Sequence, residues 1–242
     1  MLFFSSRRAG GFGGDDLWMS TRTSAKDSFQ KPVNLGASLN STANDAGPRI
    51  SDDGLTLYFC STRSGGYGNF DIWQSSRKSF TDSFRAAVNI GPEINSPAWE
   101  GLPRISSDGL ILYFDSDRPG GFGNFDLWLS VRKDIHKPFG PPENFGSQIN
   151  TKFFEGGPEL LDNRLLYFMS DRPGGYGNSD LWLINLQANG RPTGKAINAG
   201  EVVNSKVFDF GPDLSNDGTE LIFASNREGG HGDFDLWISK KK

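Results

Sequence analysis

The sequence contains few of the residues that build disulfides, metal sites and nucleophilic sites. It has one cysteine, Cys60, and two histidines, His136 and His231. A single cysteine excludes an internal disulfide, and its position within an apolar run predicts a small buried side chain. Neither histidine has partners at metal-ligand spacing, and the sequence has no Gly-x-Ser-x-Gly elbow and no phosphate-binding loop. We therefore expect no metal, no cofactor and no serine-type catalysis.

Long apolar runs and an excess of basic residues are also missing. No segment approaches the roughly 18 consecutive apolar residues of a membrane-spanning helix. The N-terminal MLFFSSRRAGG also lacks the charged-then-apolar order of a signal peptide. The 25 Lys and Arg residues against 29 Asp and Glu give a net charge of -4, whereas nucleic-acid-binding proteins usually present a basic surface. We expect neither membrane insertion nor a nucleic-acid partner.

An internal repeat is the strongest signal in the sequence. LYFCSTRSGGYGNFDIW (57–73) and LYFDSDRPGGFGNFDLW (112–128) agree at 12 of 17 positions, and further copies begin at Leu2, Leu166 and Leu221. The tryptophans that close the copies are spaced 55, 55, 54 and 55 residues apart: Trp18, Trp73, Trp128, Trp182 and Trp237. Such a period is the length of one structural unit.

Each unit contains four short segments with the character of strands. Leu-Tyr-Phe opens a strand B, and a Gly-Gly-aromatic-Gly loop leads back to a strand C that begins with Asp-Leu-Trp. A shorter strand D precedes a repeated Asn-x-Gly, and strand A lies in AGPRIS, GLPRIS, GGPELL and FGPDLS. No segment has a convincing helical period. A four-stranded unit of this length predicts an all-β protein, a β-propeller with five blades.

The predicted propeller forms one domain, 1–242, in which the first and last blades lack a strand. Its units are about 1–43, 44–98, 99–153, 154–207 and 208–242. Five B and five C strands are readable, but only four A and four D strands. The terminal blades would then present open hydrogen-bonding edges. We expect a truncated chain, an irregular closure of the ring, or a homo-oligomer in which two chains complete each other.

The run Ser-Asp-Arg-Pro-Gly-Gly-aromatic-Gly-Asn-x-Asp-Leu-Trp, at 116–128 and 170–182, resembles the WD-like repeat of TolB-type β-propellers. The resemblance extends over nearly the whole chain. It implies a binding module of the kind found in bacterial cell envelopes, periplasmic or secreted, without naming its ligand. We expect a non-catalytic scaffold that binds a protein or a cell-envelope glycan through its loop face or the channel mouth. The single cysteine does not decide the compartment.

One repeated pair of residue types predicts a staple for the loop between strands B and C. An arginine follows strand B and an aspartate opens strand C in every unit, and the loop between them lets the two meet. The aspartate can also accept backbone N–H groups from the glycine loop. The predicted structural pairs are Arg8 with Asp16, Arg63 with Asp71, Arg118 with Asp126, Arg172 with Asp180, and Arg227 with Asp235.

A carboxylate begins every readable strand A, and these four residues are the candidate ligand-binding set: Asp45, Glu100, Glu155 and Asp209. Because strand A is the innermost strand of a blade, the four could surround one mouth of the central channel, or each could cap a local turn. Positions that differ between units are better candidates for specificity, and on strand A they include Arg49, Arg104, Glu159 and Asp213. Inner-strand carboxylates also keep a glycan-cleaving enzyme open as an alternative function.

Overall fold

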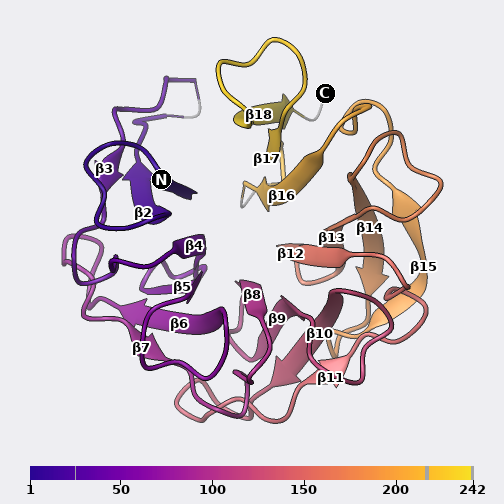
Figure 1. Cartoon of the computed structure of the whole chain (residues 1–242), viewed down its shortest axis with the longest axis horizontal. Helices are drawn as coiled ribbons and strands as arrows, with labels where there is room; N and C mark the ends of the chain where they lie inside the picture. The colour runs from indigo at the N-terminus through magenta and orange to yellow at the C-terminus, as the bar shows by residue number, and fades with distance from the viewer. Residues whose placement is uncertain (25, 216–217, 241–242) are drawn as a thin grey trace.

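The computed structural model describes residues 1–24, 26–215 and 218–240. In this part of the chain the regular elements are 18 β-strands, which form five antiparallel sheets. Figure 1 shows the sheets standing side by side around a central axis, in chain order. No helix in the described part is long and apolar enough to cross a membrane.

The four strand types predicted from the repeat are all present. The A strands are β4 (Asp45–Ile50), β8 (Glu100–Ile105), β12 (Glu155–Leu161) and β16 (Asp209–Leu214). The B strands are β1 (Leu2–Ser6), β5 (Thr56–Ser61), β9 (Ile111–Ser116), β13 (Leu165–Ser170) and β17 (Glu220–Ser225). The C strands are β2 (Asp16–Ser20), β6 (Asp71–Ser76), β10 (Asp126–Val131), β14 (Asp180–Leu186) and β18 (Asp235–Lys240). The D strands are β3 (Val33–Asn34), β7 (Val88–Asn89), β11 (Glu143–Asn144) and β15 (Pro192–Asn198).

The first and last sheets have three strands each within the described residues, as the sequence predicts. The sheet β1-β2-β3 has no A strand and the sheet β16-β17-β18 has no D strand, whereas the other three sheets have four strands. In Figure 1 the first sheet (indigo) and the last sheet (yellow) are neighbours in the ring. Arg22, which follows β2, forms an ion pair of 2.5 Å with Glu220 of β17 and so links the two sheets.

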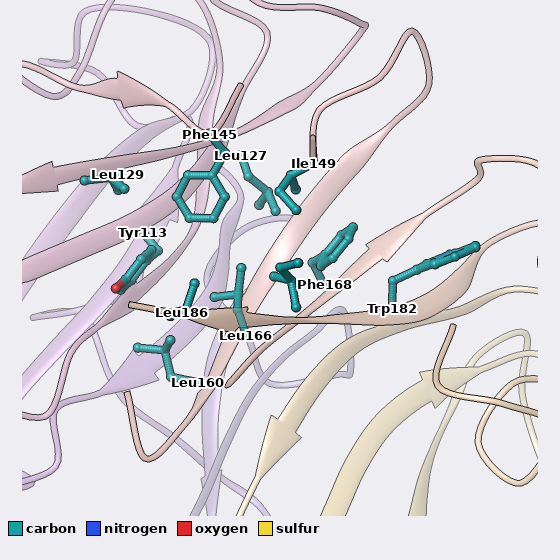
Figure 2. Packing of buried hydrophobic residues seen from close by; sticks show 11 residues of the cluster. Tyr113, Leu127, Leu129, Phe145, Ile149, Leu160, Leu166, Phe168, Trp182 and Leu186 are labelled. Atoms are coloured by element: carbon teal, nitrogen blue, oxygen red, sulfur yellow. The ribbon is translucent and has the colours of Figure 1, made fainter. Parts of the chain in front are cut away.

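The hydrophobic core lies between consecutive sheets. Leu166 and Phe168 of β13 are fully buried and belong to one cluster with Leu127 of the preceding sheet (Figure 2). The repeat tryptophans Trp18, Trp73, Trp128 and Trp182 are 6 to 8% exposed. The large rings therefore fill the space between blades. Cys60 is also buried, and burial raises the pKa of its thiol to about 12.

A buried asparagine after each D strand acts as an extra strand partner. The side-chain Oδ1 of Asn95 accepts the N–H of Ile72 at 2.8 Å, and its Nδ2 donates to the carbonyl of the same residue at 3.0 Å. The same two bonds recur at Asn40 with Leu17, Asn150 with Leu127, and Asn204 with Leu181. The side chain thus continues the pairing of strand C beyond the end of strand D, both where strand D is two residues long and beside the seven-residue β15.

Each A strand carries a β-bulge just before its central residue. The pairing register shifts there, and the bulged residue has a left-handed φ: 59° at Gly47, 44° at Leu102, 59° at Gly157 and 61° at Gly211. A proline follows each of them. Proline has no N–H to lose from the ladder, and a bulge changes the direction of the next side chains. The residues after the four prolines are Arg49, Arg104, Glu159 and Asp213.

Candidate functional site

These four residues meet at the axis of the ring, and we call them the channel cluster. Arg104 Nη2 lies 3.3 Å from Glu159 Oε1, and Arg49 Nε lies 3.6 Å from Glu159 Oε2. Arg49 Nη1 is 3.9 Å from Asp213 Oδ1. Because β4 and β12 belong to sheets that are not adjacent, the Arg49–Glu159 pair crosses the channel. The side chains that vary between repeats are therefore brought together.

Glu159 is the buried centre of the channel cluster. Its side chain is 0% exposed, whereas that of Asp213 is 33% exposed. Burial raises the pKa of Glu159 to about 7, although the positive charges of Arg104 and Arg49 oppose the shift. Two arginines and two acids give the cluster a balanced formal charge when Glu159 is ionised.

The four acids that begin the A strands are 0% exposed and do not line an open mouth. Each pairs with an arginine of its own sheet: Arg63 with Asp45 at 2.5 Å, Arg118 with Glu100 at 2.9 Å, Arg172 with Glu155 at 3.1 Å, and Arg227 with Asp209 at 2.6 Å. Each also accepts the backbone N–H of the residue four positions earlier, which is Ser41, Ser96, Thr151 or Ser205. Each acid therefore caps the turn that leads into its own strand A.

The predicted partners of the repeat arginines are therefore wrong. Arg63, Arg118, Arg172 and Arg227 pair with the acid of strand A and not with Asp71, Asp126, Asp180 and Asp235 of strand C. In the first sheet, Arg8 donates to Ser6 and its guanidinium lies over Phe4 and Trp18, while Asp16 takes part in the glycine loop. Ser61, at the end of strand B, lies opposite Asp45 of strand A on one side and opposite Asp71 of strand C on the other. Both acids are therefore near the residues that follow strand B, and Arg63 pairs with Asp45. The arginine then folds inward over the rings of strands B and C.

The aspartates that begin the C strands hold the glycine loops by backbone hydrogen bonds. Asp126 Oδ2 accepts the N–H of Phe122 at 2.6 Å, and the equivalent bonds join Phe12 to Asp16, Tyr67 to Asp71, Tyr176 to Asp180 and His231 to Asp235. The loop also packs on the connection to the next sheet. A Cβ atom on Gly123 would lie 2.3 Å from the carbonyl oxygen of Thr151. This contact and the bonds to aspartate fix the loop without a disulfide.

The face that carries these B–C loops, which we call the loop face, exposes aromatic rings at a repeated position. Phe12, Tyr67, Phe122 and Tyr176 are 48 to 50% exposed at the loop tips. Their backbone N–H groups are those bound by the strand-C aspartates, so each ring is carried by a fixed loop. The fixed loops thus hold these four rings at the surface.

A second, inner set of aromatic residues lies on the same face, between neighbouring sheets. Phe70 and Trp99 stack with ring centroids 4.2 Å apart, Trp99 and Phe125 meet edge to face at 5.6 Å, and Phe125 and Phe154 are 5.3 Å apart. Trp99 is therefore a packing residue between blades. Its stacking joins the sheets at the loop face.

The inner row is interrupted at Ser179. Ser179 occupies the repeat position of Phe70 and Phe125, directly before the aspartate of strand C. Phe208, which stands opposite it, is 41% exposed. A pocket of about 670 Å³ opens at this point and includes Asp117, Asp171 and Phe154 in its lining. We call it the Ser179 pocket.

Two smaller pockets lie at the opposite end of the channel, among the A–B turns. Their volumes are about 290 Å³ and 410 Å³, and both include Arg104, Leu214 and Ser215 in their linings. The larger of the two also contacts Asp213 and the Arg22–Glu220 pair that joins the first and last sheets. The channel cluster therefore has an accessible edge at this end.

Asp115 is a buried acid that the repeat analysis did not single out. Its side chain is 1% exposed, and Oδ2 accepts the N–H of Gly157, in the next sheet, at 2.9 Å. Burial raises the pKa of its carboxyl to about 7. A Cβ atom on Gly101 or Gly156 would lie within 2.8 Å of its oxygens, so the carboxyl fits only between glycines. The signal was present in the repeat, because the other four units carry Ser5, Cys60, Met169 and Ala224 at this position.

Five antiparallel sheets arranged around an axis, with their inner strands meeting in a channel, define the protein as a five-bladed β-propeller. No family model matches the sequence, and no curated protein matches it.

Solved structures show the same fold. TolB from Acinetobacter baumannii aligns with 14% identity and a TM-score of 0.61, over 98% of this chain and 49% of TolB. The catalytic domain of a GH62 α-L-arabinofuranosidase from Coprinopsis cinerea aligns with 11% identity and a TM-score of 0.60, over 98% of this chain and 84% of that domain. A GH43 endo-arabinanase from Bacillus licheniformis gives 14% identity and a TM-score of 0.57, over 98% and 88%. The chain thus spans about half the length of that TolB, and at these identities the likeness concerns the fold alone.

Proposed function

We propose that the protein is a non-catalytic interaction module that binds a protein or a cell-envelope glycan through its loop face. The observation that carries this proposal is the set of half-exposed rings at the loop tips, Phe12, Tyr67, Phe122 and Tyr176. Aromatic residues are enriched in binding surfaces because they bury a large area at low cost in side-chain entropy. A ring carried by a fixed loop also loses little further freedom when a partner binds.

The state of the inner-strand acids favours binding over catalysis. Glycoside hydrolysis needs two carboxyl groups that face a common cleft, one of them free to move a proton. Here Asp45, Glu100, Glu155 and Asp209 each hold an arginine of their own sheet and a backbone N–H of the connection from the preceding sheet. These ion pairs and hydrogen bonds occupy the four carboxylates in holding the turns before strand A, at the loop face.

Selection from a random peptide library and from a glycan array tests the proposal. The wild-type protein is compared with the double variant Phe122→Ala, Tyr176→Ala, whose exchanges lie at exposed loop tips and leave the core unchanged. We expect ligands that bind the wild type and are lost by the double variant. Ligands bound equally well by both proteins, or no selected ligand at all, would contradict binding through this face.

A glycan-cleaving activity is the second candidate, and one observation favours it. Asp115 and Glu159 are buried carboxyls whose pKa is raised to about 7 by burial, and such groups suit proton transfer at neutral pH. Release of reducing sugar from arabinan or from other oligosaccharides, abolished in Asp115→Asn or Glu159→Gln, would establish this function in place of the first. An activity lost instead in Glu100→Gln would assign it to the strand-A acids.

A further inference from the structure

The Ser179 pocket lies where the ring contact of the two preceding sheet junctions is not repeated. At two sheet junctions, a phenylalanine before strand C stacks on an aromatic residue before the next strand A: Phe70 on Trp99 and Phe125 on Phe154. At the following junction these positions are Ser179 and Phe208. The backbone bridge between Ser179 and Phe208 matches that between Phe125 and Phe154. The main chain therefore keeps its path, and the open space corresponds to the absent ring.

Two carboxylates stand at this space with unused acceptor capacity. Asp117 Oδ1 accepts the N–H of Trp99 at 2.8 Å, and Asp171 Oδ1 accepts the N–H of Phe154 at 2.8 Å. These bonds fix the orientation of both carboxylates, while the second oxygen of each has no hydrogen bond within the described residues. Both residues are exposed, and neither forms an ion pair in the described part of the chain.

We propose that the Ser179 pocket receives the guanidinium group of an arginine presented by a protein partner. This inference rests on the proposed interaction function and names the chemistry of one of its contacts. A guanidinium is flat, so it can lie against Phe208 in the place where the two preceding junctions hold a phenyl ring. It is also a fork of N–H donors that matches carboxylate oxygens. A phenyl ring would leave both acids unpaired, and a lysine ammonium is a compact charge that does not fill a planar slot.

The pocket also has the dimensions and position of an anchoring site. Its volume of about 670 Å³ holds an arginine side chain together with some of its flanking backbone. Arginine is among the residues that contribute most to protein interfaces when it enters such a pocket. The exposed rings of Phe122 and Tyr176 belong to the two sheets that contribute Asp117 and Asp171, so a partner that inserts an arginine lies beside them.

Peptide titrations followed by NMR of the amide groups test the assignment. The probes are N-acetyl-Gly-Arg-Gly-amide and the same peptide with citrulline, which keeps the shape of arginine without its charge, or with lysine. We expect the arginine peptide, at millimolar concentration, to shift the signals of Ser179 and Phe208. We expect citrulline to bind at least about tenfold more weakly, because it cannot form the charge-assisted bonds. Equal binding of the citrulline or the lysine peptide would overturn the assignment of a guanidinium.

Two matched pairs of variants place the binding in this pocket. Ser179→Phe introduces the ring found at the two preceding junctions and is expected to abolish binding without lowering the melting temperature, whereas Ser179→Ala leaves the pocket open and should bind as the wild type does. Asp117→Asn and Asp171→Asn are expected to weaken binding by about tenfold each. The last unit already has Asn226 at this position, where it accepts the N–H of Phe208 at 3.1 Å. The amide therefore preserves the fold. Undiminished binding by Ser179→Phe would overturn the proposal.

The outcomes separate this inference from the proposed function. If the ligands selected by the wild type contain no arginine and bind Ser179→Phe normally, yet are lost in the loop-tip double variant, the pocket assignment fails and the interaction function stands. If N-acetylglucosamine, used as a neutral sugar probe, shifts Ser179 and Phe208 while the arginine peptide does not, the pocket is a glycan site and the assignment is overturned. If neither the array nor the peptide library selects a ligand, the interaction function itself is contradicted.

Discussion

Replacing Asp115 by asparagine tests how strongly the fold opposes ionisation of this carboxyl. Burial raises its pKa from an ordinary value of 3.8 to about 7. Between these values the folded protein holds a proton that the unfolded chain has released, so stability falls as the pH rises. Three units of pKa correspond to about 4 kcal/mol. The contribution of Asp115 to stability is thus greatest below about pH 4 and is lost by about pH 7.

The assay is urea unfolding of the wild type and of Asp115→Asn at several pH values. Asparagine cannot ionise, and its Oδ1 can still accept the N–H of Gly157. The cost of its amide group does not depend on pH and cancels when the difference between the two proteins is followed. We expect the variant to gain up to about 4 kcal/mol relative to the wild type between about pH 4 and pH 8. A difference that stays constant with pH would refute the reasoning.

Three further predictions concern the loops and the channel cluster. Gly123→Ala should destabilise the protein by about 1 to 3 kcal/mol, because its Cβ would meet the carbonyl oxygen of Thr151, whereas Gly232→Ala, at the equivalent open position, should have little effect on the melting temperature. Asp126→Ala leaves the Phe122 N–H without its acceptor and should cost about 1 to 3 kcal/mol in chemical denaturation; an unchanged melting temperature would argue against this role. A double-mutant cycle of Glu159→Gln with Arg104→Gln should give a coupling of about 1 to 3 kcal/mol above pH 7 that shrinks towards pH 5 as Glu159 is protonated; a coupling independent of pH would contradict this.

The repeat made most of the fold predictable. The nearly constant spacing of the repeat tryptophans indicates that one structural unit recurs. Because that unit has turn glycines and no helical period, a four-stranded sheet is the structure that it predicts. The three-stranded first and last sheets followed from counting the A and D strands. The bulge in each A strand was harder to see, because Leu102 adopts at φ 44° the conformation that glycine has in the other three sheets.

The site was only partly predictable, because the partner of a charged side chain depends on which neighbouring strand it reaches, and the sequence alone does not give this. Arg63 and Asp71 are close in sequence, but the acid that the arginine reaches is Asp45, on the other side of strand B. The channel cluster was predicted as a set of varying positions, and the structure adds that Arg49 and Glu159 meet across the axis. Ser179 was missed because this position already varies between the copies, as Asp15 in the first unit shows, and the effect of a small residue is visible only once the neighbouring rings are placed.

The contact between each glycine loop and the following connection bears on how such a protein can change over generations. Gly13, Gly68, Gly123 and Gly177 each face the carbonyl groups that lead to the next sheet. Both halves of this joint recur with the same period, so a gene duplication of one period would bring a new loop against a new connection in the correct register. The number of blades can then change in whole steps, while individual exchanges such as phenylalanine to serine create new pockets at single joints. The shared contacts thus preserve the framework, and exchanges at a single joint can alter recognition without changing it.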